Sequence, residues 1–231
     1  MDKVAIVTAA GKGMGAAIAR ELAKTHRVVL MSPSGSAEQL AHELGGVGIS
    51  GSVTEESDLQ RLVSAALGKY GRIDAVVNNT GHPPKGDLLA LDDASWHTGL
   101  DMLILNVVRM MRLVTPVMEA QGGGAVVNIS SFAAVAPEQS MPVSSALRAA
   151  LGAWTHMYAE RYAARNIRMN AVLPGFIDSW PETPEIVDRI PAARFGKTNE
   201  IAKTVAFLLS DGAGYITGQN IRVDGAIVRA V

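Results

Sequence analysis

Residues 3–15 read Lys-Val-Ala-Ile-Val-Thr-Ala-Ala-Gly-Lys-Gly-Met-Gly, and this stretch sets the architecture expected for the whole chain. Its short apolar run is typical of a buried strand, and helical spacing of apolar residues begins close to Met14. Glycines between a strand and a helix let the backbone approach a pyrophosphate, and the first helical turn offers free N–H groups. The stretch therefore predicts a nucleotide-binding strand–turn–helix unit.

The same alternation of strand and helix patterns continues along the chain. We predict strands at residues 3–7, 27–31, 47–50, 73–78, 124–129, 167–173 and 220–223. We predict helices at residues 14–24, 37–44, 55–70, 95–120, 142–164 and 199–209. Right-handed crossovers between parallel strands then give an α/β, Rossmann-like, three-layer doubly wound fold with a seven-stranded parallel sheet. A length of 231 residues suits a single domain spanning 1–231.

Composition narrows the class of partner. The chain has 21 basic and 22 acidic residues, so nothing attracts the whole molecule to nucleic acid or anionic lipid. There is no cysteine and the five histidines are scattered, so we expect no disulfide and no metal site. No secretion signal is visible and the apolar runs are shorter than the roughly 20 residues that span a bilayer. We expect a soluble, cytoplasmic protein with a small-molecule substrate.

Motifs further along the chain resemble those of the short-chain dehydrogenases/reductases. The first glycine stretch is similar to that family's T-G-x-x-x-G-x-G loop, with Ala9 in place of the first glycine. Matching stretches follow in order: Asn-Asn-Thr-Gly at 78–81, Val-Val-Asn-Ile-Ser-Ser at 126–131, Asn-Ile-Arg-Met-Asn-Ala-Val-Leu-Pro-Gly at 166–175, Ile-Thr-Gly-Gln at 216–219 and Val-Asp-Gly-Ala at 223–226. They cover almost the full length, so the chain is identified as a divergent member of that family.

The resemblance implies a pyridine dinucleotide cofactor. Its binding residues would be Thr8, Gly11, Lys12, Gly13, Met14, Gly15, Ser32, Ser52, Val53, Asn79, Thr80, Gly81, Arg148, Pro174, Gly175 and Ile177. Ser32 stands where such folds usually carry an acid that binds the adenosine ribose and repels a 2′-phosphate. Its loss and the charge of Lys12 favour NADP over NAD. Pro33 and Ser52, which replace a second basic residue and an aspartate near the adenine, weigh against this, and Lys12 as a plain surface lysine stays open.

The resemblance fails at the family's reaction chemistry, which uses a tyrosine, a lysine four residues later, a serine and an asparagine. Ser131 matches the serine. Ser144 stands at the tyrosine position, Arg148 at the lysine position and Leu103 at the asparagine position. No tyrosine of the chain has a lysine four residues after it, so a shifted alignment does not restore the pair.

This substitution removes the expected proton donor. Hydride reduction of a carbonyl needs an acid at the developing alkoxide, and an aliphatic hydroxyl is far weaker than a phenol with a pKa of about 10. We take Ser131, Ser144 and Arg148 as the candidate catalytic residues, an electropositive pocket able to bind a carboxylate or an oxyanion. The alternatives are plain helix-surface polarity for Ser144 and an ordinary ion pair for Arg148.

Two further residues are candidates to replace the missing proton donor and the missing asparagine. His82 titrates near neutrality and could supply a proton, although an ordinary loop histidine is the simpler interpretation. Asn106 lies three residues beyond Leu103 on the same helical face and could partly take the asparagine's place, with plain packing as the alternative.

Three functions stay open at this point. The favoured one is a divergent NAD(P)-dependent oxidoreductase acting on a small carbonyl or alcohol, with water, His82 or the substrate as proton source. The second is a catalytically inactive sensor or regulator that binds NADP or a metabolite. The third is a non-redox enzyme on the same scaffold, for which the family's halohydrin dehalogenases, with arginine in place of the lysine, are the comparison; unlike this chain, they keep the tyrosine.

The long irregular segment 174–194 is a candidate substrate lid, with a plain strand-to-helix connection as the alternative. The family resemblance also implies a homo-oligomer, a tetramer or dimer. A homotetramer would be built through the two long helices, 95–120 and 142–164, and the last strand.

Overall fold

The computed structural model describes residues 2–229 as one seven-stranded sheet in the order β3-β2-β1-β4-β5-β6-β7. Every neighbouring pair of strands is parallel. The strands are β1 (Lys3–Val7), β2 (His26–Ser32), β3 (Val47–Ser50), β4 (Ala75–Asn78), β5 (Gly124–Ile129), β6 (Ile167–Pro174) and β7 (Asn220–Val223). The predicted fold class is confirmed, and each predicted strand agrees with the observed one within two residues.

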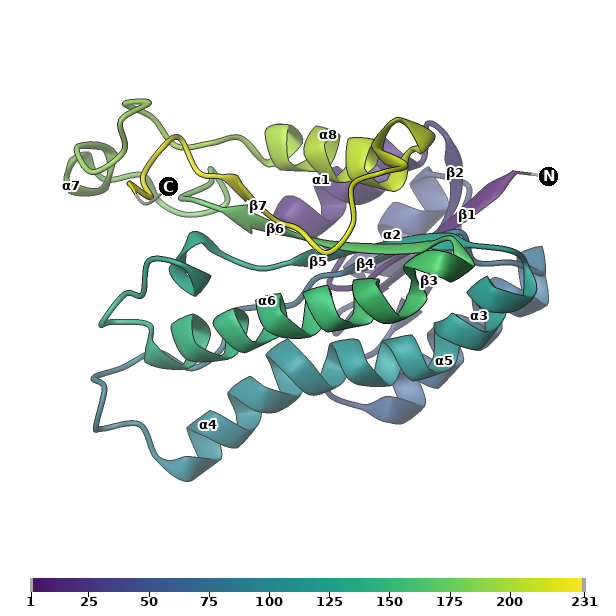
Figure 1. Cartoon of the computed structure of the whole chain (residues 1–231), viewed down its shortest axis with the longest axis horizontal. Helices are drawn as coiled ribbons and strands as arrows, with labels where there is room; N and C mark the ends of the chain where they lie inside the picture. Colours follow the sequence, from purple (N-terminus) through teal and green to yellow (C-terminus); the bar gives the residue numbers. More distant parts are fainter. Residues whose placement is uncertain (1, 230–231) are drawn as a thin grey trace.

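Helices cover both faces of the sheet (Figure 1). One face carries α1 (Gly13–Leu22), α2 (Ser36–Glu43) and α8 (Thr198–Leu209), and the other carries α3 (Glu56–Tyr70), α5 (Asn106–Ala120) and α6 (Pro142–Tyr162). Alternate side chains of each strand enter opposite layers: Ala5 and Val7 pack with α1 and α8, whereas Val4 and Ile6 pack with α3 and α5. Because both faces are buried, the strands read as continuous apolar runs.

The helix predicted at 95–120 begins earlier, and its hydrogen-bond pattern changes part-way along. It starts as α4 (Asp93–Leu100), where Asp92 caps the end by accepting from the Ser95 N–H at 2.9 Å. A π-helical turn, η1 (Asp101–Leu105), then joins α4 to α5. The extra residue of a π-turn shifts the apolar stripe between two stretches that each keep helical spacing, so the pattern still predicts one helix.

The remaining helical pieces are short. They are α7 (Pro184–Val187), inside the segment predicted to be irregular, and the 3₁₀ turns η2 (Phe132–Ala134), η3 (Ala163–Arg165) and η4 (Asp211–Ala213). Within residues 2–229 no helix combines the length and the apolar character needed to cross a membrane.

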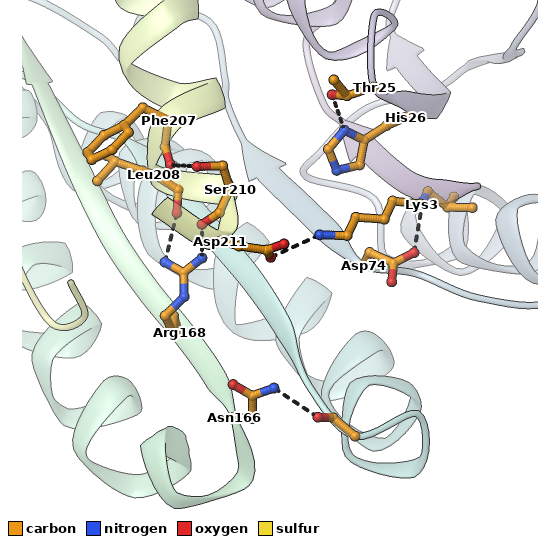
Figure 2. Close-up of polar contacts among 12 residues, drawn as sticks. Lys3, Thr25, His26, Asp74, Asn166, Arg168, Phe207, Leu208, Ser210 and Asp211 are labelled. Carbon is orange, nitrogen blue, oxygen red and sulfur yellow. Dashed lines mark hydrogen bonds and ion pairs between the residues drawn. The ribbon is translucent and has the colours of Figure 1, made fainter. Parts of the chain in front are cut away.

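The amino ends of the strands are closed by a polar network (Figure 2). Lys3 pairs with Asp211 at 3.0 Å, and Arg168 donates to the carbonyls of Leu208 at 2.7 Å and Ser210 at 3.0 Å. Asp74 accepts from the backbone N–H of Val4 at 2.8 Å. These contacts fasten the end of α8 to the sheet at the edge opposite the glycine loop.

The carboxyl edge is where a ligand site is expected. The chain order reverses at β1, which lies between β2 and β4, and open α/β sheets bind ligands in the crevice beyond such a reversal. The loops that follow β1, β4, β5 and β6 meet there, and they carry the motifs singled out in the sequence.

Candidate functional site

The loop between β1 and α1 has the geometry of an anion cradle. Gly13 has φ +55°, and a Cβ on Gly15 would overlap the carbonyl oxygen of Ala9 and lie 2.8 Å from Asn79 Nδ2. α1 begins at Gly13 with no side-chain cap from Lys12 and no acidic residue in its first turn. Its leading N–H groups are thus left without a capping side chain, which is the arrangement that binds a pyrophosphate. The residues present fit a dinucleotide.

The loop after β4 is bonded directly to this cradle. Thr8 Oγ1 donates to the Asn79 carbonyl at 2.6 Å and accepts from the Asn79 N–H at 2.9 Å. Asn79 Nδ2 donates to the Ala9 carbonyl at 3.3 Å. Two predicted cofactor residues, Thr8 and Asn79, therefore lie together and hold the glycine loop in shape.

The predicted adenosine-side residues are engaged locally. Ser32 is buried, donates to the Ser34 carbonyl at 2.7 Å and accepts from the Ala37 N–H at 3.2 Å. The Ser52 hydroxyl lies 2.7 Å from Thr54 Oγ1, and Val53 is half-buried. Lys12 is exposed at the start of α1. Of these residues, Lys12 has a side chain that is free to turn towards a phosphate without giving up a hydrogen bond in residues 2–229.

A cavity of about 430 Å³ lies beside the glycine loop, which is within the range of small-molecule sites. It brings together most of the predicted residues: Met14, Asn79, Thr80, Gly81, Ser131, Ser144, Arg148, Pro174, Gly175 and Ile177. Leu103 and Asn106 are buried but do not line it. Asn106 is therefore not placed to touch a ligand in this cavity.

Arg148 is the most unusual side chain of the cavity. It is 7% exposed; Nε donates to Ser144 Oγ at 3.2 Å and Nη1 donates to the Ile129 carbonyl at 2.7 Å. Among residues 2–229 no carboxylate lies within ion-pair distance of it, so the ordinary ion pair considered from the sequence is wrong. Burial lowers the pKa of Arg148 to about 10, which still leaves it charged at neutral pH.

The two serines of the site are oriented by N–H donors. Ser144 Oγ accepts from Arg148, and Ser131 Oγ accepts from the Ala133 N–H at 3.2 Å at the start of η2. A hydroxyl that accepts one bond keeps its own hydrogen to donate. Both serines line the cavity, so both can donate to a ligand oxygen.

The segment 174–194 contributes Phe176, Trp180 and Ile186 to the cavity lining, and it is fastened at three places. At its base, Ile177 pairs with Gly196 as an isolated bridge. Trp180 Nε1 donates to His82 Nε2 at 2.8 Å, and Lys85 Nζ lies 3.7 Å from the centre of the Trp180 ring. Arg189 pairs with Glu138. We call the His82–Lys85–Trp180 contact the clasp.

Sequence reasoning did not find the clasp or the Arg189–Glu138 pair. Trp180 and His82 are 98 positions apart, and Arg189 and Glu138 are 51 apart, so no local spacing links them. His82, the candidate proton source, does line the cavity. Partial burial lowers its pKa, as do the charges of Lys85, Arg148 and Lys12.

Residues 8–227 match the family model described as enoyl-(acyl carrier protein) reductase. The chain is 31% identical to the 3-oxoacyl-[acyl-carrier-protein] reductase FabG of Thermotoga maritima over 98% of each chain. The chain belongs to the short-chain dehydrogenase/reductase family. Dehydrogenase/reductase SDR family member 4 of Oryctolagus cuniculus is 34% identical over 97% of this chain and 93% of that protein.

A solved structure of this family has the same architecture. The L-sorbose reductase of Gluconobacter frateurii, complexed with NADPH and L-sorbose, superimposes with a TM-score of 0.91 at 27% identity and covers 100% of both chains. Together with the sequence relatives, it supports an NAD(P)-dependent oxidoreductase family for this chain.

Proposed function

We propose that the protein is an NADP-dependent oxidoreductase that interconverts a small carbonyl compound and its alcohol with an atypical set of residues. The observation that carries the proposal is that the glycine loop and the cavity with the candidate catalytic residues adjoin each other. Met14, on the first turn of α1, also lines the cavity that contains Ser131, Ser144 and Arg148. A dinucleotide held at the glycine loop would thus reach this cavity, where it would supply or accept a hydride.

The residues of the cavity have separate roles in the proposed reaction. Ser131 and Ser144 donate to the substrate oxygen and stabilise the charge that develops on it. Arg148 keeps Ser144 in place and makes its hydroxyl a stronger donor. The proton comes from water or from His82 in its imidazolium form. While Nε2 of that ring accepts from Trp180 the ring is neutral and its remaining hydrogen, on Nδ1, is too weakly acidic to be transferred, so His82 can act only when the Trp180 bond is open.

We also propose that NADP is preferred over NAD. Ser32 carries no negative charge to repel a 2′-phosphate, and the exposed Lys12 adds a cation to the glycine loop. Titration of NADPH and of NADH, followed by intrinsic fluorescence, tests this preference. Equal affinity for the two cofactors would contradict it.

The test of activity is turnover of a panel of small carbonyl compounds and alcohols by the NADP(H)-loaded protein. The matched variant combines Ser144→Tyr, Arg148→Lys and Leu103→Asn, which restores the family's side chains. A correctly placed general acid contributes roughly 10²–10⁴ in rate, so we expect this variant to be faster by about that factor. A folded triple variant that binds NADPH and is no faster than the wild type would contradict the idea that only these groups are missing.

A sensor that binds NADP or a metabolite is the second candidate. It is favoured by one observation: no tyrosine lines the cavity within residues 2–229, although the cradle is intact. Tight NADPH binding by the wild type without turnover of any compound in the panel supports this candidate over the oxidoreductase. A non-redox enzyme would instead act on a substrate without consuming NADPH.

A further inference from the structure

The buried charge of Arg148 has no counter-charge in the described structure. Its Nε and Nη1 atoms are bonded to Ser144 and to the Ile129 carbonyl, and both of these acceptors are neutral. The third nitrogen, Nη2, has no hydrogen-bond acceptor in residues 2–229, and the residue lines the cavity. Arg148 thus presents an unused donor and a full charge to this space.

The surrounding charges do not compensate for it. Glu138 is the single acidic residue among the cavity's lining residues in the described part of the chain, and it is already paired with Arg189. Lys85 adds a second cation near the mouth, beside Trp180. The cavity therefore has an excess of positive charge at its floor and at its entrance.

Unpartnered hydroxyls lie on the same wall. Thr80 Oγ1 and Ser130 Oγ are buried without a hydrogen-bond partner, and both residues line the cavity. Ser130 directly follows Ile129, whose carbonyl accepts from Arg148. Buried polar groups are usually satisfied, so these two hydroxyls are unmet hydrogen-bonding groups next to the cavity, although their oxygen atoms are themselves covered.

We propose that the ligand of this cavity carries a carboxylate, which Arg148 binds through Nη2. This step rests on the proposed function. Together they imply that the substrate is a small carbonyl compound that also carries a carboxylate group. Removing a cation from water without a partner is costly, and an entering anion offsets that cost. A substrate hydroxyl or a ribose hydroxyl satisfies the hydrogen bond but leaves the charge uncompensated.

The experiment compares an acid with a neutral molecule of the same shape. Binding of 4-oxopentanoate and of 4-oxopentanamide is measured by calorimetry, with and without NADPH. A hydrogen bond to a charged group is roughly twice as strong as a neutral one, so we expect the acid to bind the wild type at least about tenfold more tightly. Acetate and 2-oxobutanoate are included as shorter carboxylates.

Arg148→Met is the decisive variant and Lys85→Met is its matched control. The first removes the buried charge, and we expect it to abolish the preference for the acid. Loss of the hydrogen bonds to Ser144 and the Ile129 carbonyl is expected to cost about 1–3 kcal/mol of stability, partly offset by removal of the buried charge, so the melting temperature of the variant is measured to verify that it is folded. The second removes the cation at the mouth and should keep the preference.

Three results would overturn the inference. They are equal binding of acid and amide by the wild type, a preference that survives in Arg148→Met, and failure of all the carboxylates to bind. If Arg148→Met loses NADPH affinity but keeps the acid preference, the guanidinium serves the cofactor instead. A wild-type protein that prefers the acid but binds no NADPH would refute the proposed function while leaving the carboxylate site standing.

Discussion

Ala9 holds a backbone conformation that L-residues other than glycine, asparagine and aspartate rarely adopt. Its φ of +46° lies in the left-handed region, at the position where related sequences carry the first glycine of the loop. The loop tolerates this cost because Thr8, Asn79 and Gly15 hold it from three sides. The nucleotide cradle therefore contains stored strain at one residue.

We predict that Ala9→Gly stabilises the protein. Relief of the left-handed strain raises the free energy of unfolding by about 1–2 kcal/mol. The greater conformational freedom of glycine in the unfolded chain lowers it by about 0.4–1 kcal/mol. The expected net gain is about 0.5–1 kcal/mol, measured by urea unfolding. Ala10→Gly is the control: Ala10 is fully buried and is not among the residues with positive φ, so that variant should be less stable. A destabilised Ala9→Gly would contradict this account of the loop.

Two glycines of the same loop should differ in their response to alanine. A Cβ on Gly15 would meet the backbone carbonyl of Ala9, which cannot move without breaking the turn. A Cβ on Gly11 would instead meet side-chain atoms, the hydroxyls of Ser36 and Ser32 and, at 3.1 Å, the Cβ of Ser36, which can give way more easily than a backbone carbonyl. We expect Gly15→Ala to lose about 1–3 kcal/mol of stability together with NADPH binding.

Gly11→Ala, by contrast, should keep the fold and retain measurable NADPH affinity. Unfolding curves and cofactor titrations on the two variants, made side by side, check this ordering. Equal losses would mean that the close approach of Ala9 and Gly15 is not what holds the cradle.

At the scale of elements, the sequence predicts what local spacing controls. Apolar runs predicted all seven strands, and the glycine loop predicted the cradle. Ser131, Ser144 and Arg148 were found through the family resemblance, and the structure has all three in the lining of one cavity. The π-helical turn η1 was not predicted, because the stretches before and after it each keep the spacing of an α-helix. The clasp was not predicted either. It depends on how far segment 174–194 folds back towards His82, and no periodicity of the sequence indicates that distance.

We predict that the clasp makes the segment 174–194 sensitive to pH. Trp180 can donate to His82 Nε2 only while that nitrogen is unprotonated. Partial burial, with the positive charges of Lys85, Arg148 and Lys12, lowers the pKa of His82 in the closed form. When the segment opens, the pKa returns towards the ordinary value of about 6.5. The open form therefore binds the proton more readily than the closed form.

It follows that the clasp is fully formed above about pH 6.5 and is lost as the pH falls through the lowered pKa of His82. Trp180 fluorescence should change over that acid range in the wild type. In His82→Gln, whose amide oxygen accepts a hydrogen bond without titrating, the change should vanish. Trp180→Phe reports the background from Trp96 and Trp154. An acid transition of full size in His82→Gln would show that another group controls it.

At the scale of the whole molecule, the outer faces of α5 and α6 leave apolar and aromatic side chains uncovered. The two helices lie side by side on one face of the sheet (Figure 1). The groove between them is lined by Pro116, Trp154, Met157 and Tyr162 together with the charged residues Arg112, Glu119 and Arg161. Met157 is 59% exposed. Large exposed apolar patches on a protein surface often mark interfaces. We propose that this face joins protomers in the homotetramer that the family resemblance implies.

Met157→Glu tests this proposal, because a charge buried at the centre of an apolar interface is strongly unfavourable. We expect the wild type to have the mass of a tetramer in light scattering and the variant to dissociate into smaller species. Leu89→Glu is the matched control: Leu89 is 91% exposed, but it belongs to the loop between β4 and α4 and does not line the groove, so the assembly should survive. The outer face of α5 and α6 would have no such role if the wild type is monomeric or if Met157→Glu keeps the full mass.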